Sequence, residues 1–183
     1  MKRNFDRKDL PEFTPYEFVG VPDGYTFDLG EGYEVELVWL GGHAPGNAGY
    51  LDKKNRIFFP GDDLCSDISG VGGGPRPGEE YGQYKNIETF RDNLARLMDR
   101  ADEFDHVFPS HFMVDLETAV LMEELETCNA ILEDPDGYDY KAVSVSPNGG
   151  APRERMFKYI KGFGPIAYTE KGIYRPNAEE CKD

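Results

Sequence analysis

Apolar and polar residues alternate along the first third of the chain in patterns that predict β-strands. Residues 33–40 (YEVELVWL) place glutamates between apolar side chains, which is the period of a half-buried strand, and Val38 with Leu40 makes its end apolar on both faces. Residues 48–51 and 56–59 are two further apolar stretches. The polar residues 53–55 between them predict a hairpin turn, so this region predicts three consecutive strands.

Further along the chain the apolar residues change to a helical spacing. They predict an amphipathic helix over residues 87–101, capped by Asn86, and a second helix over about 115–132. Residues 106–112 between the helices predict a short strand that ends in a loop, and the tail contains two strand candidates, at 142–146 and 166–174. The order of strands, helix, strand, helix and strands predicts an α/β (α+β) layered domain.

Residues 66–86 form a long predicted loop that contains the glycine-rich stretch GVGGGPRPG. This stretch lacks the Gly-Lys-Ser/Thr of a phosphate-binding loop, so we interpret the segment as a flexible lid over the active face. Tyr81 and Tyr84 just beyond it are candidates for lining a substrate pocket, although aromatic residues more commonly pack such a loop down.

Composition narrows the classes of function. The 183 residues carry a net charge of −15, which argues against nucleic-acid binding because such binding needs a cationic surface. We expect no membrane span and no secretory signal, since no long apolar run exists. The cysteines Cys65, Cys128 and Cys181 are widely spaced, with no CxxC, and predict free thiols in a reducing cytoplasm.

His43, Asp62 and His111 each follow the end of a predicted strand, which is where open α/β sheets collect their ligands. Two imidazoles and a carboxylate suit a divalent metal such as zinc, iron(II) or manganese. Taken singly, each residue also has an ordinary interpretation as a turn or helix-entry residue. We interpret His106 as structural or exposed and Cys65 as a small buried thiol.

The motif chain resembles one known family. GGHAPGNAGYLDKKNRIFFPGDD is similar to the His-x-Pro-Gly … Gly-Asp segment of metallo-β-lactamase-fold hydrolases, and HVFPSHF resembles their last ligand motif. By this resemblance His43 is similar to the third histidine of the first metal site, Asp62 to the carboxylate that bridges two metals, and His111 to the last histidine of the second site. The resemblance implies half of an αββα sandwich, with a mixed sheet and helices on one face, and zinc as the cofactor.

The sequence lacks the family's His-x-His-x-Asp-His signature, and only residues 1–42 precede His43. We therefore expect one truncated domain over residues 1–183 that corresponds to the family's carboxyl-terminal half. Residues 1–19 are a linking segment, 20–132 carry the motifs, and 133–183 supply carboxyl-terminal strands. Half of the family's metal site is missing, so we expect one metal ion or none.

The family's chemistry is hydrolysis by metal-activated water of ester, amide or thioester bonds, with Asp62 as the catalytic carboxylate. The chain is then an incomplete or weakly active fragment that acts on a small-molecule substrate. Two alternatives stay open, a non-catalytic association module with vestigial ligands and an unrelated α/β protein in which the three side chains lie far apart. Half a sandwich would leave Trp39, Phe58 or Phe59 open, so we expect a homodimer or pairing with a missing amino-terminal half.

Overall fold

The alternating residues of the first predicted strand form β2, in a sheet that the hairpin and the later short strands extend. The computed structural model describes residue 8 and residues 11–145 and 152–176. Its main sheet has the order β1-β2-β3-β4-β5-β6. The strands are β1 (Thr26–Asp28), β2 (Glu34–Trp39), β3 (Ala48–Asp52), β4 (Ile57–Phe59), β5 (His106–Val107) and β6 (Leu116–Glu117). All neighbours are antiparallel except β4 and β5, so the predicted mixed sheet is confirmed.

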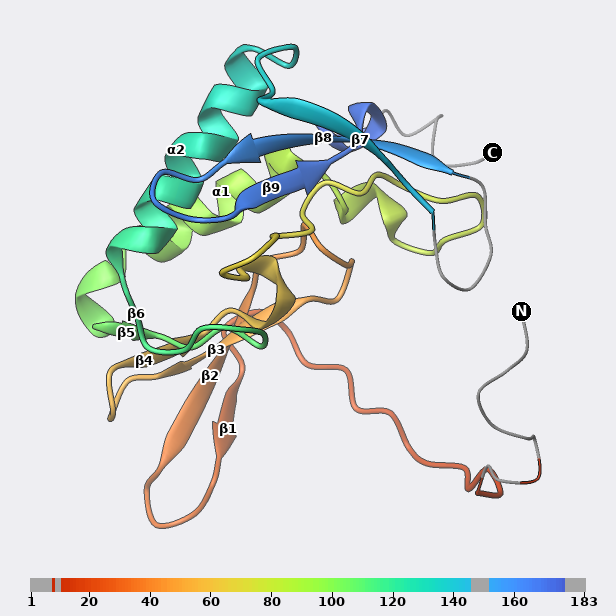
Figure 1. The fold of residues 1–183 in the computed structure, drawn as a ribbon. Coiled ribbons are helices and arrows are strands. Elements are labelled where there is room, and N and C mark those ends of the chain that lie inside the picture. Colours follow the sequence, from red (N-terminus) through yellow and green to blue (C-terminus); the bar gives the residue numbers. More distant parts are fainter. Residues whose placement is uncertain (1–7, 9–10, 146–151, 177–183) are drawn as a thin grey trace.

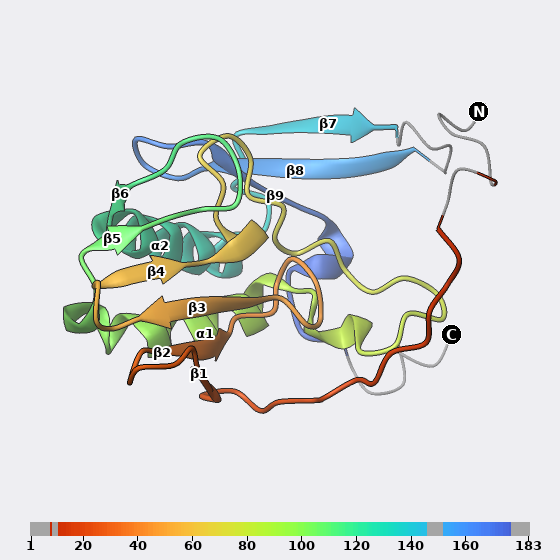
Figure 2. The ribbon, with the colours of Figure 1, turned by 90° about the horizontal axis from the view of Figure 1, so that it is seen from below.

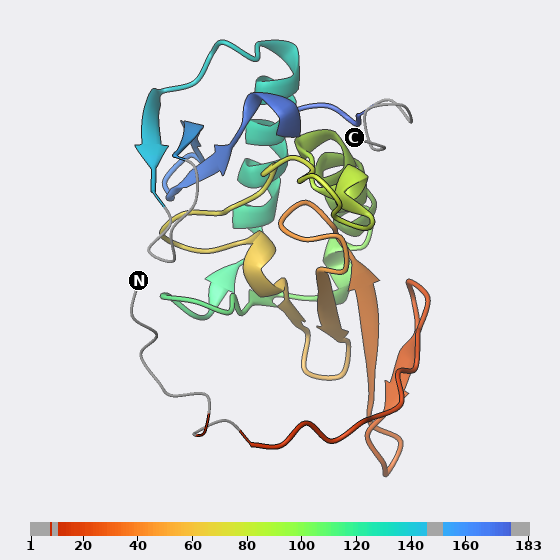
Figure 3. The same ribbon diagram turned by 90° about the vertical axis from the view of Figure 1, so that its right-hand side faces the viewer.

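Two helices, α1 (Ile87–Met98) and α2 (Ala119–Glu133), pack against each other on one face of this sheet (Figures 1 and 3). The predicted cap of α1 is present, because the Asn86 side-chain oxygen accepts the Thr89 N–H at 2.7 Å. The predicted helix 115–132 starts later than expected. Leu116 and Glu117 instead pair with β5 as strand β6, and this long-range pairing takes precedence over the local helical pattern.

A second sheet, β7 (Tyr140–Ser144), β8 (Arg153–Tyr159) and β9 (Pro165–Tyr168), is antiparallel and lies on the helix side of the main sheet (Figure 1). The strand predicted at 166–174 ends at Tyr168, where a 3-10 turn, η5 (Glu170–Gly172), follows. The last residue of the strand predicted at 142–146 lies outside the described residues. The sequence pattern did not predict β8, because its charged residues hide a strand of which only the middle is buried.

The two faces of the main sheet differ in what covers them. Cross-strand partners Leu51 and Phe58 face the helices and are completely buried in the core. A Cβ at Gly49 would lie only 2.4 Å from the Phe58 ring, so this glycine makes room for the ring. On the other face, Tyr50 and Phe59 are 42% and 38% exposed. The expectation that Phe58 lies open is therefore wrong, whereas Phe59 does lie open and Trp39 is half-buried.

Residues 11–19 form no helix or strand and extend away from the sheet, as the red and orange trace of Figures 1 and 2 shows. In the described part of the chain, none of the helices is both long and apolar enough to cross a membrane.

Candidate metal centre

The first candidate ligand, His43, is positioned by a tight turn after β2. Gly41 and Gly42 both have positive φ, of 68° and 76°. A Cβ on Gly42 would lie 2.9 Å from side-chain atoms of Phe90 and Val71, so the turn can approach the core only because this residue is glycine. The close approach places His43 at the end of β2, where its side chain is 39% exposed.

Asp62 lies in a 3-10 turn, η2 (Gly61–Asp63), directly after β4, and His111 lies in the loop after β5. Because β4 and β5 are parallel neighbours, their carboxyl ends meet at the same edge of the sheet. The Ser110 N–H donates to the Gly61 carbonyl at 3.4 Å, which ties the two loops together. The sheet topology therefore brings Asp62 and His111 side by side.

Asp62 is the point at which the three predicted residues meet. Its Oδ1 lies 3.2 Å from Nε2 of His111, and its Oδ2 lies 3.8 Å from Nε2 of His43. All three side chains reach solvent, with exposed fractions of 39% for Asp62 and 59% for His111. Their convergence argues against an unrelated protein in which they lie far apart, whereas their role as metal ligands stays a prediction.

The His43 ring is oriented by a backbone carbonyl. Its Nδ1 lies 3.1 Å from the Gly70 oxygen, so this nitrogen donates to the carbonyl and Nε2 lies on the side of Asp62. A carbonyl that holds the far nitrogen of an imidazole is the usual second partner of a metal-binding histidine. A Cβ at Gly70 would lie 3.3 Å from Nδ1, a tight contact that the glycine avoids.

A second carboxylate, Asp63, supports the same loop from inside the protein. It is completely buried, and it accepts the His43 backbone N–H at 3.1 Å and a side-chain N–H of Asn47. Burial raises the pKa of Asp63 to about 8. The sequence pattern did not single out Asp63 as a functional residue. The available signal was Asn47, an amide in the same turn that could satisfy a buried acid.

Comparisons with known proteins identify the fold. No protein-family model matches the sequence, and no curated protein matches it significantly. Among solved structures, a β-lactamase domain protein from Burkholderia ambifaria aligns with a TM-score of 0.50 and 18% identity, over 66% of this chain and 36% of that one. This chain has part of the metallo-β-lactamase fold.

Two further solved structures with this fold align less closely. A metallo-β-lactamase family protein from Thermus thermophilus gives a TM-score of 0.49 and 21% identity, over 69% of this chain and 40% of that chain. A metallo-β-lactamase from Pontibacter korlensis gives a TM-score of 0.43 and 23% identity, over 60% of this chain and 50% of that chain. The chain thus spans between 36% and 50% of the length of these three structures.

The metallo-β-lactamase fold implies a metal, and the chemistry of the three donors fits one. Two ligands of a tetrahedral zinc ion lie about 3.3 Å apart when each bond is about 2.0–2.1 Å. The Asp62–His111 pair, at 3.2 Å, has this spacing, and the Asp62–His43 pair, at 3.8 Å, is slightly longer. Within the described ranges, no three His, Cys, Asp or Glu side chains are already close enough together to count as a metal site.

The other singled-out residues around this fold have structural partners. His106 contacts Asp115 at 2.5 Å, with its side chain 51% exposed. Cys65 is buried, and burial raises the pKa of its thiol to about 11, as for a small buried thiol. Cys65 and Cys128 are free, and Cys181 lies outside the described residues.

The glycine-rich loop is held down by its own backbone rather than arranged as a phosphate cradle. The N–H groups of Gly72 and Gly74 donate to the carbonyls of Gly42 and Lys85. The buried Lys85 ammonium bonds both carboxylate oxygens of Glu79, at 2.8 and 2.9 Å. The backbone bonds use the N–H groups that a phosphate would need.

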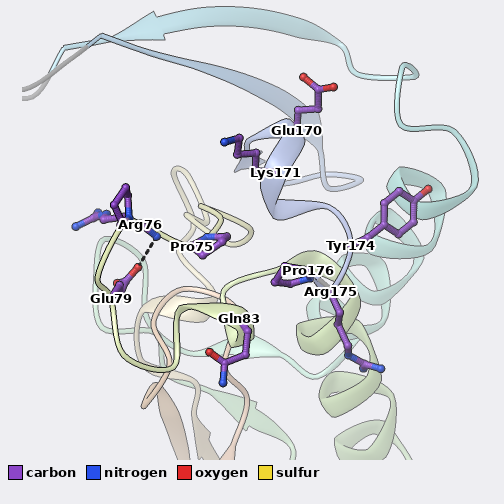
Figure 4. Close-up of a pocket in the computed structure, with 10 residues that line it drawn as sticks. Pro75, Arg76, Glu79, Gln83, Glu170, Lys171, Tyr174, Arg175 and Pro176 are labelled. Atoms are coloured by element: carbon purple, nitrogen blue, oxygen red, sulfur yellow. Dashed lines mark hydrogen bonds between the residues drawn. The ribbon is translucent and has the colours of Figure 1, made fainter. Parts of the chain in front are cut away.

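A cavity of about 690 Å³ lies between this loop and the segment after η5 (Figure 4). Pro75, Gln83, Lys171 and Tyr174 are among its walls, and none of the three candidate ligands is. Tyr81 and Tyr84 also lie outside it, against a smaller cavity of about 330 Å³ beside Trp39, Pro45 and Gly46.

Proposed function

We propose that this chain provides a metal-dependent hydrolytic site in which His43, Asp62 and His111 hold one divalent ion, zinc. The observation that carries the proposal is the position of the Asp62 carboxylate, which faces Nε2 of both histidines from a third segment of the chain. The shared fold supports the proposal, because the aligned structure from Burkholderia ambifaria is a β-lactamase domain protein.

Each residue has a proposed task. The Gly70 carbonyl and the Asp63 carboxyl group fix the His43 ring and backbone, so that Nε2 faces Asp62. Asp62 adds a negative charge between the histidines and is the catalytic residue, orienting the attacking water by accepting its hydrogen bond. When bound, zinc supplies the Lewis-acid chemistry that activates water toward an ester, amide or thioester carbonyl.

Zinc binding to the whole chain tests the proposal directly. Protein purified without chelator is dialysed against zinc, and bound metal is measured by elemental analysis and titration calorimetry. We expect one zinc ion per chain. The Asp62→Asn substitution should weaken binding by more than about 100-fold, because it removes a ligand rather than an outer partner.

Asp67→Asn is the matched control, since Asp67 is an exposed aspartate five residues further along the chain. It should leave the zinc affinity unchanged. Two zinc ions per chain would overturn the mononuclear site, and equal affinity in the wild-type and Asp62→Asn proteins would overturn the assignment of the ligands.

The second candidate function is a non-catalytic association module. It is favoured by the apolar open face of the main sheet and by the absence, among the described residues, of three donors already close enough to hold a metal. In this case the contacts of Asp62 with the histidines are ordinary ion pairs. No zinc binding together with self-association would favour this function.

A further inference from the structure

An aromatic pocket lies beside the loop 41–47, which also carries His43. Its cavity of about 330 Å³ is lined by Trp39, Pro45, Gly46, Tyr81 and Tyr84, with no charged side chain. Pro45 is two residues from His43, so their Cα atoms are at most about 7.6 Å apart. The pocket and one candidate ligand, His43, therefore share one short loop.

The walls of the pocket come from two segments that are bonded together. Within the first segment, the Trp39 indole N–H donates to the Pro45 carbonyl at 2.9 Å. The Gly42 N–H joins this segment to the second one by donating to the Tyr84 carbonyl at 3.1 Å. The Trp39 and Tyr84 rings meet edge to face, with their centroids 5.2 Å apart. Figures 1 and 2 show the two loops side by side.

Tyr81 completes the pocket from an unusual backbone conformation. Its φ is 62° and its ψ is 15°, in the left-handed region that a bulky aromatic residue rarely adopts. Its side chain is nevertheless not used for packing the loop down, since the residue is 57% exposed. Strained residues that persist without a packing role are concentrated at binding sites.

We propose that this aromatic pocket, formed by Trp39, Pro45, Gly46, Tyr81 and Tyr84, binds an uncharged aromatic group of the substrate next to the bond that is hydrolysed. The inference rests on the proposed function for the reaction, but ring binding itself needs no metal. A third ring can stack on the Trp39–Tyr84 pair from the solvent side, with Tyr81 beside it. The substrate class is then esters, amides or thioesters that carry an uncharged aromatic group.

Ligand binding in the pocket can be followed by tryptophan fluorescence, because Trp39 is the only tryptophan in the sequence. In the presence of EDTA, the full chain is titrated with 2-phenylacetamide, and with acetamide as its ringless match, while tryptophan emission is recorded. We expect a saturable change with 2-phenylacetamide, in the millimolar range typical of so small a ligand, and none with acetamide.

Three variants separate the pocket from unspecific ring binding. Tyr81→Ala should weaken binding about threefold to tenfold, as the loss of one ring–ring contact does, whereas Tyr81→Phe keeps the ring and should bind normally. Tyr159→Ala is the matched control, because Tyr159 is 54% exposed on β8 and outside the pocket. It should leave binding unchanged.

No saturable change with 2-phenylacetamide, or an equal loss in Tyr81→Ala and Tyr159→Ala, would overturn the pocket. Hydrolysis of ethyl phenylacetate and ethyl acetate by the zinc-loaded chain separates the two proposals. Ring binding without zinc binding would refute the proposed function alone. Hydrolysis with no preference for the phenylacetyl ester would refute the pocket alone.

Discussion

The two faces of the six-stranded sheet carry similar apolar residues but have different surroundings. Phe58 and Phe59 are neighbours in β4, yet Phe58 is completely buried under the helices and Phe59 is 38% exposed. On the open face the ring of Phe59 contacts Phe108, with centroids 5.9 Å apart, and Tyr50 pairs with Phe59 across the strands. The covered face supplies the stability of the fold, and the open face leaves apolar surface available for association.

The largest expected effect compares these two neighbours. Phe58→Ala should lower the free energy of unfolding by about 3–5 kcal/mol, because it leaves a cavity in a packed core. Phe59→Ala should cost less than about 1 kcal/mol, since its side chain is only partly buried. Urea unfolding followed by circular dichroism measures both, and similar losses would contradict the difference between the faces.

The covered layer contains a completely buried acid, Glu124 on α2. Neither of its carboxylate oxygens has a hydrogen-bond partner in the part of the chain that the structure describes. Glu124→Met should raise the free energy of unfolding at pH 7 by about 1–3 kcal/mol, because it removes an unsatisfied buried group. Glu126→Met on the exposed side of the same helix should change it little.

The same variant has a pH signature. Burial raises the pKa of Glu124 well above its ordinary value of 4.5, and the nearby Asp63 raises it further. Such a group contributes stability that is fully present below the unfolded pKa and is lost as pH rises through the folded pKa. The increase in the free energy of unfolding that Glu124→Met causes should therefore be small at about pH 4 and largest above about pH 5. A gain that is the same at both pH values would contradict a raised pKa.

Association through the open face stays a prediction. If the chain forms a homodimer through this face, Tyr50→Lys should raise the dissociation constant at least about tenfold, because it places a charge in an apolar interface. Met122→Lys, at a 44% exposed position on α2, is the control. Sedimentation velocity measures both, and a wild-type monomer at micromolar concentration would contradict homodimerisation.

The smallest expected change in the free energy of unfolding concerns Arg100 and its ion pairs with Glu36 and Glu103. Arg100 bonds Glu36 at 2.7 and 2.9 Å and Glu103 at 2.8 and 3.0 Å. Its guanidinium lowers the pKa of Glu103 to about 2, so this stability is present above the unfolded pKa of about 4.5 and is lost as pH falls toward 2.

Arg100→Gln should reduce that acid dependence and cost about 1 kcal/mol at pH 7, because partial exposure screens the charges. Arg96→Gln is the control, since the Arg96 side chain is 60% exposed and its contact with Asp23 is 3.4 Å long. Unfolding curves between about pH 2 and pH 7 measure both variants. Equal acid dependence in the two variants would contradict the role of Arg100.

Local patterns predicted the elements whose residues interact over a few positions. The hairpin over 48–59 and the Asn86 cap of α1 depend on neighbours close by in the chain, and both are present. The pattern around 115–118 was misleading, because strand β6 forms by pairing with residues nine or more positions away. Strand β8 was not predicted, because its buried middle depends on β7, β9 and α2.

The sequence by itself determined that His43, Asp62 and His111 follow the ends of strands, because strand periodicity and turn residues are local properties. Only the tertiary structure decided that Asp62 lies between the two histidines, since this depends on the parallel pairing of β4 and β5, which are far apart in the chain. It also decided that Asp63, rather than Asp62, is buried, and that Tyr81 lies beside Trp39. Burial and long-range register are set by the whole packed chain, and no short stretch of sequence contains them.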